Sequence, residues 1–338
     1  MNKITTIGLD LAKSVFHLVC CDKRGKVVQK KMLRRSQLLK YFVNLPGCLV
    51  GMEACASAHY WARELEVLGH QVRLISPQFV KAYVRGNKND YNDALAIAEA
   101  VVRPEMRFVA VKTTDQQDLQ ALLRLREGCL KERTALCNRI RGLLAEYGLT
   151  LPRGVNVLRQ HLPELLEDGK NGLNDLFRRL LAEGYQQLKE LDRHIASYTQ
   201  ELERQAQQHD ECRRLQTIPG YGPIVASAFH SVIGNGEAYR RGRDVPASLG
   251  LVPRQHSSGG KNVLLGISKR GDRYLRSLLV HGARSVVIQA VKKDDRLSRW
   301  INRIRAERGF NKAVVALANK MARIGWAILA HKTVYQAA

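Results

Sequence analysis

Apolar and polar positions alternate in short segments at the start of the chain. Residues 3–9 are rich in β-forming side chains, and residues 15–21 alternate between apolar and polar. A turn-forming stretch at 22–25 precedes a third segment of this type at 26–32. Three such segments joined by short turns predict an antiparallel meander of strands.

Helical and strand-like patterns then follow one another up to about residue 105. Short apolar runs at 48–52 and 71–75 predict buried strands. Four helical patterns lie before, between and after them, at residues 36–43, 58–68, 77–84 and 92–102. Three meander strands, helix, strand, helix, strand and helix is the element order of the ribonuclease H fold. The sequence therefore predicts an α/β, ribonuclease H-like domain over residues 1–105.

The middle of the chain has the spacing of long amphipathic helices. Four apolar residues recur every seven positions, at Leu122, Cys129, Leu136 and Leu143. After a break at Pro152 and Pro163, a second apolar run with spacings of mostly three and four extends from Leu173 to Leu202. This pattern predicts a long coiled-coil region over residues 106–210, either an antiparallel hairpin or a dimer seam. An ordinary helical bundle packed on its own chain is an equally good explanation.

The last part, residues 211–338, is predicted to be a mostly α-helical domain. An apolar helix at 223–233 follows a Pro- and Gly-containing turn, which suits either a helix-hairpin-helix contact with phosphate or a plain turn between helices. Residues 243–272 are rich in Gly, Ser and Pro and predict irregular structure with short strands. Basic helices are predicted at 273–291 and 296–330.

The charge of the chain indicates a polyanionic partner. Lys and Arg number 55 against 31 Asp and Glu, which gives a net charge of +24, and residues 240–338 alone hold 21 basic against 5 acidic residues. Neutralising nucleic-acid phosphates releases counterions and drives the binding of such proteins. A basic protein without a nucleic-acid role is the simpler alternative, but the uneven distribution favours a phosphate-facing C-terminal domain.

Cysteine usage and hydropathy indicate an intracellular location. The seven cysteines form no CxxC pair and no zinc-ligand spacing, as is typical of reduced packing residues in a cytosolic protein. No apolar run approaches the about 18 residues of a membrane span. An acidic residue near the N-terminus interrupts the apolar core that a signal peptide would need. We expect a cytoplasmic protein without a membrane partner.

Four acidic residues are predicted to meet at one edge of the N-terminal sheet. Asp10 ends the first strand, and Glu53 directly follows the strand at 48–52. Asp90 and Asp93 lie at the start of a helix and, three positions apart, project from one face of it. Four carboxylates repel one another unless a cation neutralises them, and Mg²⁺ prefers carboxylate, water and phosphate oxygens. The pattern therefore predicts a metal site for phosphoryl transfer.

Each acid taken alone has a simpler explanation. Asp10 suits a turn at the end of a strand, and Asp90 and Asp93 suit the positive end of a helix dipole. Their joint placement favours metal ligation. The first motif, GLDLAK, also resembles the phosphate loop of sugar kinases and actin-like ATPases, but their further Gly-rich loops are missing from the sequence. Three histidines show no ligand spacing and are predicted to have ordinary surface or core roles: His17, His59 and His70.

A serine pair lies in the Gly-rich segment of the C-terminal domain. Ser257 and Ser258 precede two glycines, which leave the backbone free to bring a hydroxyl close to another group. Cations near a hydroxyl that attacks phosphorus would stabilise the developing charge. Taken alone, the segment is more simply a flexible turn, and its cations are solvated surface charges. Six basic residues around the pair are candidate phosphate contacts: Arg254, Lys261, Lys269, Arg270, Arg273 and Arg276.

Together these motifs resemble the DEDD transposases of bacterial insertion sequences, a family described as bridge-RNA-guided recombinases. The resemblance runs through nearly the whole chain, in the family's order and spacing. The motifs that carry it are GLDLAK at 8–13, GMEACASAHYW at 51–61, KNDYNDA at 88–94, IPGYGP at 218–223, and LGLVPRQHSSGG with GISKRGDRYLR between 249 and 276.

The resemblance implies three regions and one set of site residues. The regions are a RuvC-like metal-dependent catalytic domain at 1–105, a coiled-coil oligomerisation region at 106–210 and a basic transposase domain with a catalytic serine at 211–338. The family serine directly precedes a glycine, which matches Ser258 better than Ser257. The family's four acids, which would hold Mg²⁺ or Mn²⁺, correspond to Asp10, Glu53, Asp90 and Asp93.

The resemblance also implies an activity and partners. The chain would be a DNA recombinase that cuts and rejoins donor and target DNA through a covalent phosphoserine link. A structured noncoding guide RNA would pair with both DNAs, and the chain would act as a homo-oligomer, a dimer or a tetramer on DNA, associated with the nucleoid when active. Two rival hypotheses are a metal-dependent junction nuclease in which water attacks, and a nucleic-acid-binding scaffold without activity.

Overall fold

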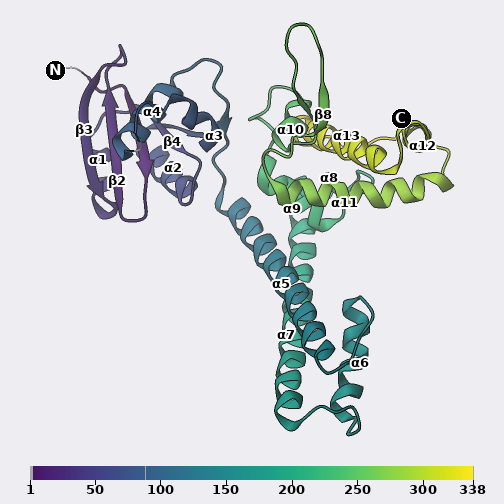
Figure 1. The fold of residues 1–338 in the computed structure, drawn as a ribbon. Coiled ribbons are helices and arrows are strands. Elements are labelled where there is room, and N and C mark those ends of the chain that lie inside the picture. Colours follow the sequence, from purple (N-terminus) through teal and green to yellow (C-terminus); the bar gives the residue numbers. More distant parts are fainter. Residues whose placement is uncertain (1–2, 88, 338) are drawn as a thin grey trace. The chain divides into compact units, whose positions relative to one another are not determined.

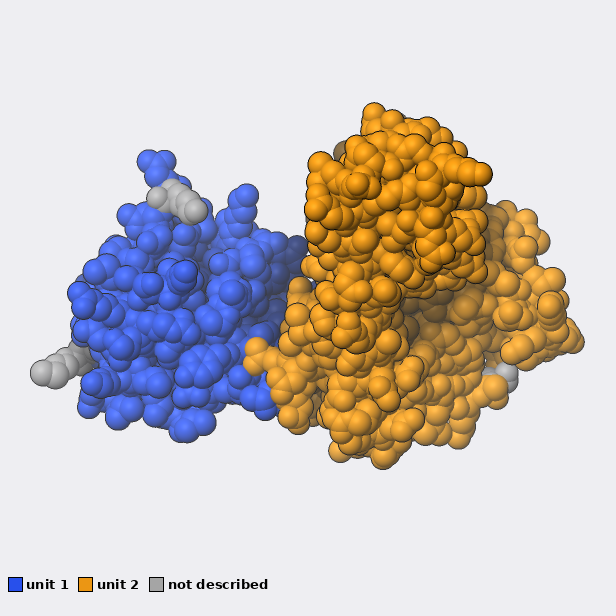
Figure 2. All heavy atoms as spheres, turned by 90° about the horizontal axis from the view of Figure 1, so that it is seen from below, with its two compact units in different colours: residues 1–114 blue, residues 115–338 orange. Residues whose placement is uncertain are grey.

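A computed structural model describes residues 3–87 and 89–337 of the chain. The chain divides into two compact units, which we call unit 1 (residues 1–114) and unit 2 (residues 115–338), shown in different colours in Figure 2. Unit 1 is an α/β unit built on a mixed sheet, and unit 2 is mostly helical.

Unit 1 contains a six-stranded sheet in the order β3-β2-β1-β4-β5-β6 (Figure 1). Its strands are β1 (Thr6–Leu11), β2 (Val15–Cys21), β3 (Val27–Arg34), β4 (Leu49–Glu53), β5 (Gln71–Ile75) and β6 (Phe108–Val109). The first three form the antiparallel meander that the sequence predicts, and β4 and β5 continue the sheet in parallel to β1. The two residues of β6, antiparallel to β5, are too few to give a pattern in the sequence.

Helices cover both faces of this sheet. They are α1 (Leu38–Val43), α2 (Ala58–Val67), α3 (Pro77–Val80) and α4 (Asp90–Val101), with short 3₁₀ turns η1 (Arg35–Gln37) and η2 (Lys81–Tyr83). Side chains of α1 and α2 pack with Ile7 and Leu9 of β1. Helix α4 lies on the opposite face, where Ala94 and Ala98 pack with Val19 of β2. The alternation along β1 thus assigns one set of its residues to each helical layer.

The two longest helices of the chain, α5 (Thr114–Ala145) and α7 (Asp175–Gln208), form an antiparallel hairpin. The shorter helix α6 (Val155–Glu167) lies beside it. Helices α5 and α7 run side by side in Figure 1. The Nε of Arg126 on α5 donates to Thr199 on α7 at 2.7 Å. An antiparallel hairpin within one chain is one of the arrangements that the sequence left open for these helices.

Two details of the middle region differ from the sequence prediction. Pro163 lies inside α6 rather than in a break, because Leu158 and Leu162 of that helix are fully buried and hold it against its neighbours. Of the predicted heptad residues, Leu136 is buried but Leu143 is 48% exposed, so the predicted seam is only partly the buried one. The buried side chains of α5 are Leu119, Leu123, Leu136, Cys137, Ile140 and Leu144.

The rest of unit 2 is a helical core with one small hairpin. Its elements are α8 (Asp210–Gln216), α9 (Pro223–Ile233), α10 (Asp244–Ser248), β7 (Pro253–Gln255), β8 (Leu264–Ile267), α11 (Arg273–Gln289), η3 (Ala290–Lys292), α12 (Arg296–Arg308) and α13 (Phe310–His331). Helix α9 has the predicted bounds. The helix predicted at 296–330 is two helices, because Gly309 has a φ of +86°, a conformation that breaks a right-handed helix.

Helix α13 is long and apolar enough to cross a membrane by length and composition alone, whereas the sequence pattern predicts no apolar run of that length. Half of its most apolar window is buried inside the protein. Leu317, Met321 and Leu329 belong to the main hydrophobic core of unit 2. Its apolar residues therefore have the placement expected of a core helix.

Candidate active site and basic groove

Two of the four predicted acids lie at neighbouring strand ends in unit 1. Leu9 of β1 pairs with Met52 of β4 in the parallel register, and Asp10 and Glu53 are the next residue of each strand. Both strands therefore bring a carboxylate to the same edge of the sheet, as the sequence predicts.

Two glycines determine which helix these carboxylates face. A Cβ on Gly8 would lie 1.9 Å from the backbone oxygen of Ala94, and a Cβ on Gly51 would lie 2.8 Å from the Cβ of Val101. Helix α4 therefore approaches the sheet where side chains are missing. Because strand residues two apart share a face, Asp10 lies on the face of Gly8 and Glu53 on the face of Gly51, toward α4.

Helix α4 brings the other two acids to the same place. It begins at Asp90, two residues before the predicted start, because the side chain of Asn89 caps it by accepting from the N–H of Tyr91 at 2.8 Å. Asp93 follows in the first turn. Carboxylate oxygens of Asp10, Asp90 and Asp93 lie within 4.8 Å of one another. We call these three residues the acidic group.

Glu53 lies beside the acidic group rather than within it. Among the described residues that could share one ion, the group within 4.8 Å comprises the three aspartates and does not include Glu53. The negative charge of Glu53 nevertheless raises the pKa of Asp10, and the negative charge of Asp93 raises the pKa of Glu53. The four predicted acids are thus neighbours, with three of them in closer contact.

The electrostatics of the acidic group favour a cation. Burial, together with the negative charges of Asp93, Asp90 and Glu53, raises the pKa of Asp10 from 3.8 to about 6, although His17 acts in the opposite direction. Burial and the charge of Asp93 also raise the pKa of Glu53. Oxygen-only donors at this spacing match the ligands of a hard divalent ion, whose charge would reverse these shifts. The residues present therefore fit a divalent metal.

His17 belongs to this site, contrary to the sequence prediction of an ordinary role. Its position on β2 pairs with that of Asp10 on β1, and its Nδ1 lies 3.4 Å from Oδ2 of Asp90. The antiparallel register of the first hairpin was the signal that could have found it. His59 and His70 have the ordinary roles expected: His59 accepts from the N–H of Lys112 at 3.2 Å, and His70 is buried beside Cys48.

The serine pair lies at the exposed tip of the β7–β8 hairpin in unit 2. The hydroxyl of Ser257 accepts from the N–H of Val263 at 3.2 Å and from the side-chain amide of Gln255 at 3.1 Å. The carbonyl of Ser258 accepts from the N–H of Lys261 at 3.0 Å and so closes the turn. The hydroxyl of Ser257 therefore supports the hairpin, whereas Ser258 contributes its backbone.

The six predicted basic contacts have different surroundings. Five of them are exposed on the hairpin, on the loop after it or at the start of α11: Arg254, Lys261, Lys269, Arg270 and Arg273. Arg276 is half-buried, and its Nη1 donates to the carbonyls of Leu249 at 2.9 Å and Arg270 at 2.8 Å. Arg276 therefore holds the loop that carries Arg270 in place.

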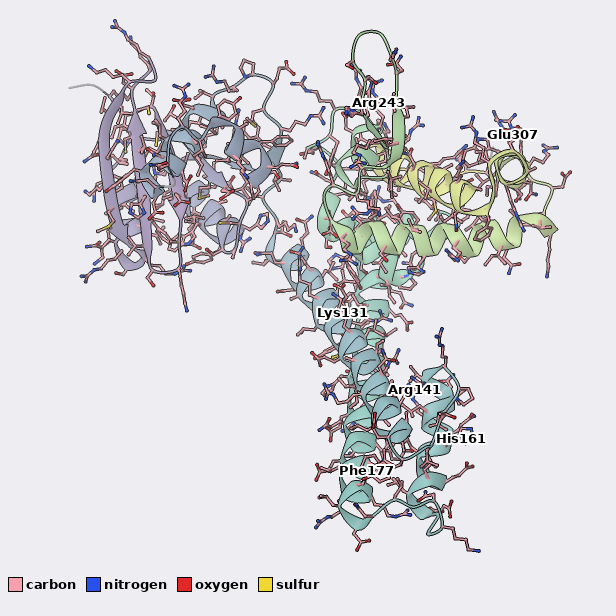
Figure 3. The ribbon with its side chains drawn as sticks, in the orientation of Figure 1. Lys131, Arg141, His161, Phe177, Arg243 and Glu307 are labelled. Carbon is pink, nitrogen blue, oxygen red and sulfur yellow. The ribbon has the colours of Figure 1, made fainter. Side chains whose placement is uncertain are left out.

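A larger basic surface in unit 2 was not singled out from the sequence. A groove of about 1750 Å³ lies among β8, α12, α13 and the loop before α10. Arg243 and the acidic Glu307, both labelled in Figure 3, are among its lining residues. We call this surface the basic groove, because seven basic residues line it: Arg241, Arg243, Arg303, Arg308, Lys312, Lys320 and Arg323. The sequence showed basic helices here, but the shared surface arises only when they pack together.

Comparisons with known proteins identify the family of the chain. Residues 7–149 match the DEDD transposase domain of the IS110 type, and residues 212–298 match the transposase IS116/IS110/IS902 family. The chain belongs to this family of transposases. These matches include Asp10, Glu53, Asp90 and Asp93 in the first and Ser258 in the second.

Curated relatives of this transposase are similar along its whole length. The transposase for insertion sequence element IS1111A of Coxiella burnetii is 46% identical over 99% of this chain and 92% of its own. A probable family 20 transposase of Pseudomonas aeruginosa is 48% identical over 98% of this chain and 99% of its own. The transposase for IS1328 of Yersinia enterocolitica is 42% identical over 99% of both chains. The chain is therefore an enzyme of DNA transposition.

Proposed function

We propose that this transposase cuts and rejoins DNA with a divalent-metal site made by Asp10, Glu53, Asp90 and Asp93 and with Ser258 as the nucleophile. The observation that carries the proposal is the acidic group, whose three carboxylates lie within 4.8 Å of one another although Asp10 is far from the other two in sequence. Repulsion among these carboxylates would destabilise the fold, so their placement is best explained by a function that needs a bound cation.

Mg²⁺ or Mn²⁺ is the ion that the ligand set suits, because all of the ligands are oxygen atoms. Bound there, the ion would supply positive charge to the oxygens of the scissile phosphate. The three aspartates would hold it from β1 and α4, and Glu53 would complete the set from β4. His17 would orient the carboxylate of Asp90 from the neighbouring strand.

The Ser258 hydroxyl oxygen would attack the scissile phosphorus. A phosphoserine P–O bond forms, the P–O bond to the leaving deoxyribose oxygen breaks, and the hydroxyl proton ends on that oxygen or in solvent. Rejoining reverses the exchange, with a deoxyribose hydroxyl as the attacking group. Ser258 suits this role better than Ser257, because the Ser257 hydroxyl already accepts two hydrogen bonds within the hairpin.

The basic residues would hold nucleic-acid backbones. Lys and Arg side chains recognise phosphates and carry little information about base sequence. Five of the six predicted contacts are exposed, and Arg276 would act by holding Arg270 in place. We propose that a structured noncoding guide RNA supplies the sequence recognition by pairing with donor and target DNA, while the basic groove holds phosphates. Because transposases act on DNA, the expected location is the bacterial cytoplasm.

The proposal also includes the architecture that the family resemblance implies. A RuvC-like, ribonuclease H-like domain at 1–105 is supported by the meander β3-β2-β1 continued by parallel β4 and β5. A coiled-coil oligomerisation region at 106–210 is supported by exposed leucines on α7, where Leu176 is 58% and Leu180 is 53% exposed. The transposase domain would occupy 211–338, and the working enzyme would be a homo-oligomer.

Trapping a covalent protein–DNA adduct tests the nucleophile. Purified transposase with the RNA that co-purifies with it, labelled substrate DNA and Mg²⁺ should give an adduct that survives denaturation in detergent. Ser258→Ala should abolish the adduct, while Ser257→Ala should keep it. Cleavage by Ser258→Ala without an adduct would show that water attacks and that the enzyme is a nuclease of the junction-resolving kind. Asp10→Asn should lose both cleavage and adduct.

A further inference from the structure

Unit 2 contains a second group of ligand-type side chains, which has no part in the proposed chemistry. His209 lies at the junction of α7 and α8, Glu211 lies in the first turn of α8, and His230 lies near the end of α9. One ligand atom from each of the three residues lies within 4.8 Å of the others. The two imidazole rings have their centroids 5.7 Å apart.

His230 has an unusual environment for a polar residue. Its side chain is buried, with only 9% of the residue exposed, and its Nδ1 has no hydrogen-bond partner in the described structure. A buried polar atom without a partner costs free energy unless something else binds the group. Burial also lowers the pKa of His230 and so favours the neutral form of its ring. A neutral imidazole with a free lone pair is the form that binds metal ions.

The surrounding charges are compatible with a cation. Glu211 and Asp115 act on His230 as negative charges, and His209 and Arg214 act as positive ones. The positive charge of Arg214 is offset, since its Nε donates to Asp210 at 2.8 Å. The cluster therefore combines two nitrogen donors, one carboxylate and a nearby second acid.

We propose that His209, Glu211 and His230 form a binding site for a transition-metal ion of the Zn²⁺ class. Two imidazoles and one carboxylate are a ligand set that Zn²⁺ accepts in tetrahedral coordination, with water in the fourth position. Imidazole donors select Zn²⁺, Cu²⁺, Ni²⁺ or Fe²⁺ over Mg²⁺, which prefers the oxygen ligands of the acidic group. The two sites of this chain would therefore take different metals.

The ion would act as a clamp between helices. It would join the end of α7, the last element of the long hairpin, to α9 in the core of unit 2. Since a ligand that binds only the folded state stabilises it, Zn²⁺ should raise the thermal unfolding midpoint of the protein. The site does not depend on the proposed DNA chemistry, so each proposal can fail while the other stands.

Zn²⁺ binding to the full-length protein tests this site directly. The metal-free protein is titrated with Zn²⁺ against a chromophoric chelator, in excess Mg²⁺ so that the acidic group does not contribute. We expect one Zn²⁺ per chain. His209→Ala and Glu211→Gln should each weaken binding by at least the about 10- to 100-fold that follows the loss of residues supporting metal ligands. Both residues are only half-buried, so neither change empties the core.

A matched control separates ligation from surface histidine effects. His194→Ala removes an exposed imidazole from the same helix, α7, and should leave Zn²⁺ affinity unchanged. Co²⁺ in place of Zn²⁺ should give the visible absorption bands of a tetrahedral Co²⁺ ion, and His209→Ala should lose these bands. Absence of saturable Zn²⁺ binding, wild-type affinity in His209→Ala and Glu211→Gln, or a loss in His194→Ala as large as theirs would each overturn the proposal.

Discussion

The Nδ1 of His17 lies 3.4 Å from Oδ2 of Asp90, so a strand residue contacts the first residue of helix α4. The ring of His17 also packs edge-on against that of Tyr91, with centroids 4.9 Å apart. His17 is mostly buried, with 13% of its side chain exposed, whereas 57% of the Asp90 side chain is exposed. An exposed carboxylate has many orientations, and the contact with His17 restricts them.

His17 is therefore expected to position Asp90 for metal binding. His17→Ala should raise the Mg²⁺ concentration needed for half-maximal cleavage by about 10-fold or more, the effect typical of losing a residue that orients a metal ligand. Saturating Mg²⁺ should restore most of the cleavage rate. Asp90→Ala, which removes a ligand, should not recover. If excess Mg²⁺ fails to rescue His17→Ala, the positioning role is wrong.

The acidic group should make the metal-free protein less stable as the pH rises. The pKa of Asp10 is about 6 in the folded protein against 3.8 as its ordinary value, so the folded state binds more protons between these pH values. Unfolding free energy therefore falls as the pH rises from about 4 to 6, and the penalty is fully present above that range. Thermal unfolding in EDTA should show this trend, and Asp10→Asn should remove most of it.

The comparison with Asp10→Asn separates Asp10 from other titrating groups. His230 has a lowered pKa and shifts stability in the opposite direction, but it does so equally in both proteins. At neutral pH without metal, Asp10→Asn should unfold at a higher temperature than the wild type, although it is inactive. Added Mg²⁺ should stabilise the wild type and leave the variant unchanged. A variant that is less stable than the wild type in EDTA would contradict this account.

The closeness of β1 and α4 should make Gly8 sensitive to the smallest substitution. A Cβ at Gly8 would lie 1.9 Å from the oxygen of Ala94 and 2.6 Å from the nitrogen of Ala98, both backbone atoms. Gly8→Ala would push α4 away from the sheet and separate Asp93 from Asp10. We expect a loss of about 1–3 kcal/mol or more in unfolding free energy, together with loss of cleavage.

Gly142→Ala is the matched control for this change. Gly142 lies in helix α5, and apart from the nearby backbone of that helix no atom lies within 4 Å of the position of its Cβ. Alanine there should be neutral or stabilise the protein by up to about 1 kcal/mol, because alanine favours helix more than glycine does. Chemical denaturation and cleavage assays on both variants measure the difference. Equal stabilities for the two would show that α4 does not approach the sheet this closely.

The basic groove should contribute to nucleic-acid affinity through phosphates. Arg303→Ala should weaken binding of RNA and DNA about equally across sequences and reduce the slope of log affinity against log salt by about 1. Arg204→Ala removes an arginine of α7 that is paired with Glu201 on the same helix and does not line the groove, and it should change neither quantity. Titrations at several salt concentrations provide the test, and an unchanged slope for Arg303→Ala would exclude the groove as a phosphate contact.

Patterns in the sequence were sufficient for most of unit 1. The strands at 15–21 and 71–75 have the bounds that their alternation and apolar runs predict. Alternation with a period of two decides which residues share a face, and the order of strands then brings Asp10 and Glu53 to one edge. The acids could be found in this way because Asp10 and Glu53 lie at the ends of strands and Asp90 and Asp93 at the start of a helix, and each of these elements has a local pattern of its own.

Contacts between distant segments decided the rest. The heptad pattern did not show which leucines of α5 would be buried, because that depends on α6 and α7, and Pro163 stays helical because its neighbours pack. The role of His17 follows from the register of the first hairpin and from the position of α4, and the basic groove from the packing of α12 and α13. Local periodicity encodes secondary structure and burial, whereas the meeting of distant side chains depends on packing free energies that no short stretch of sequence contains.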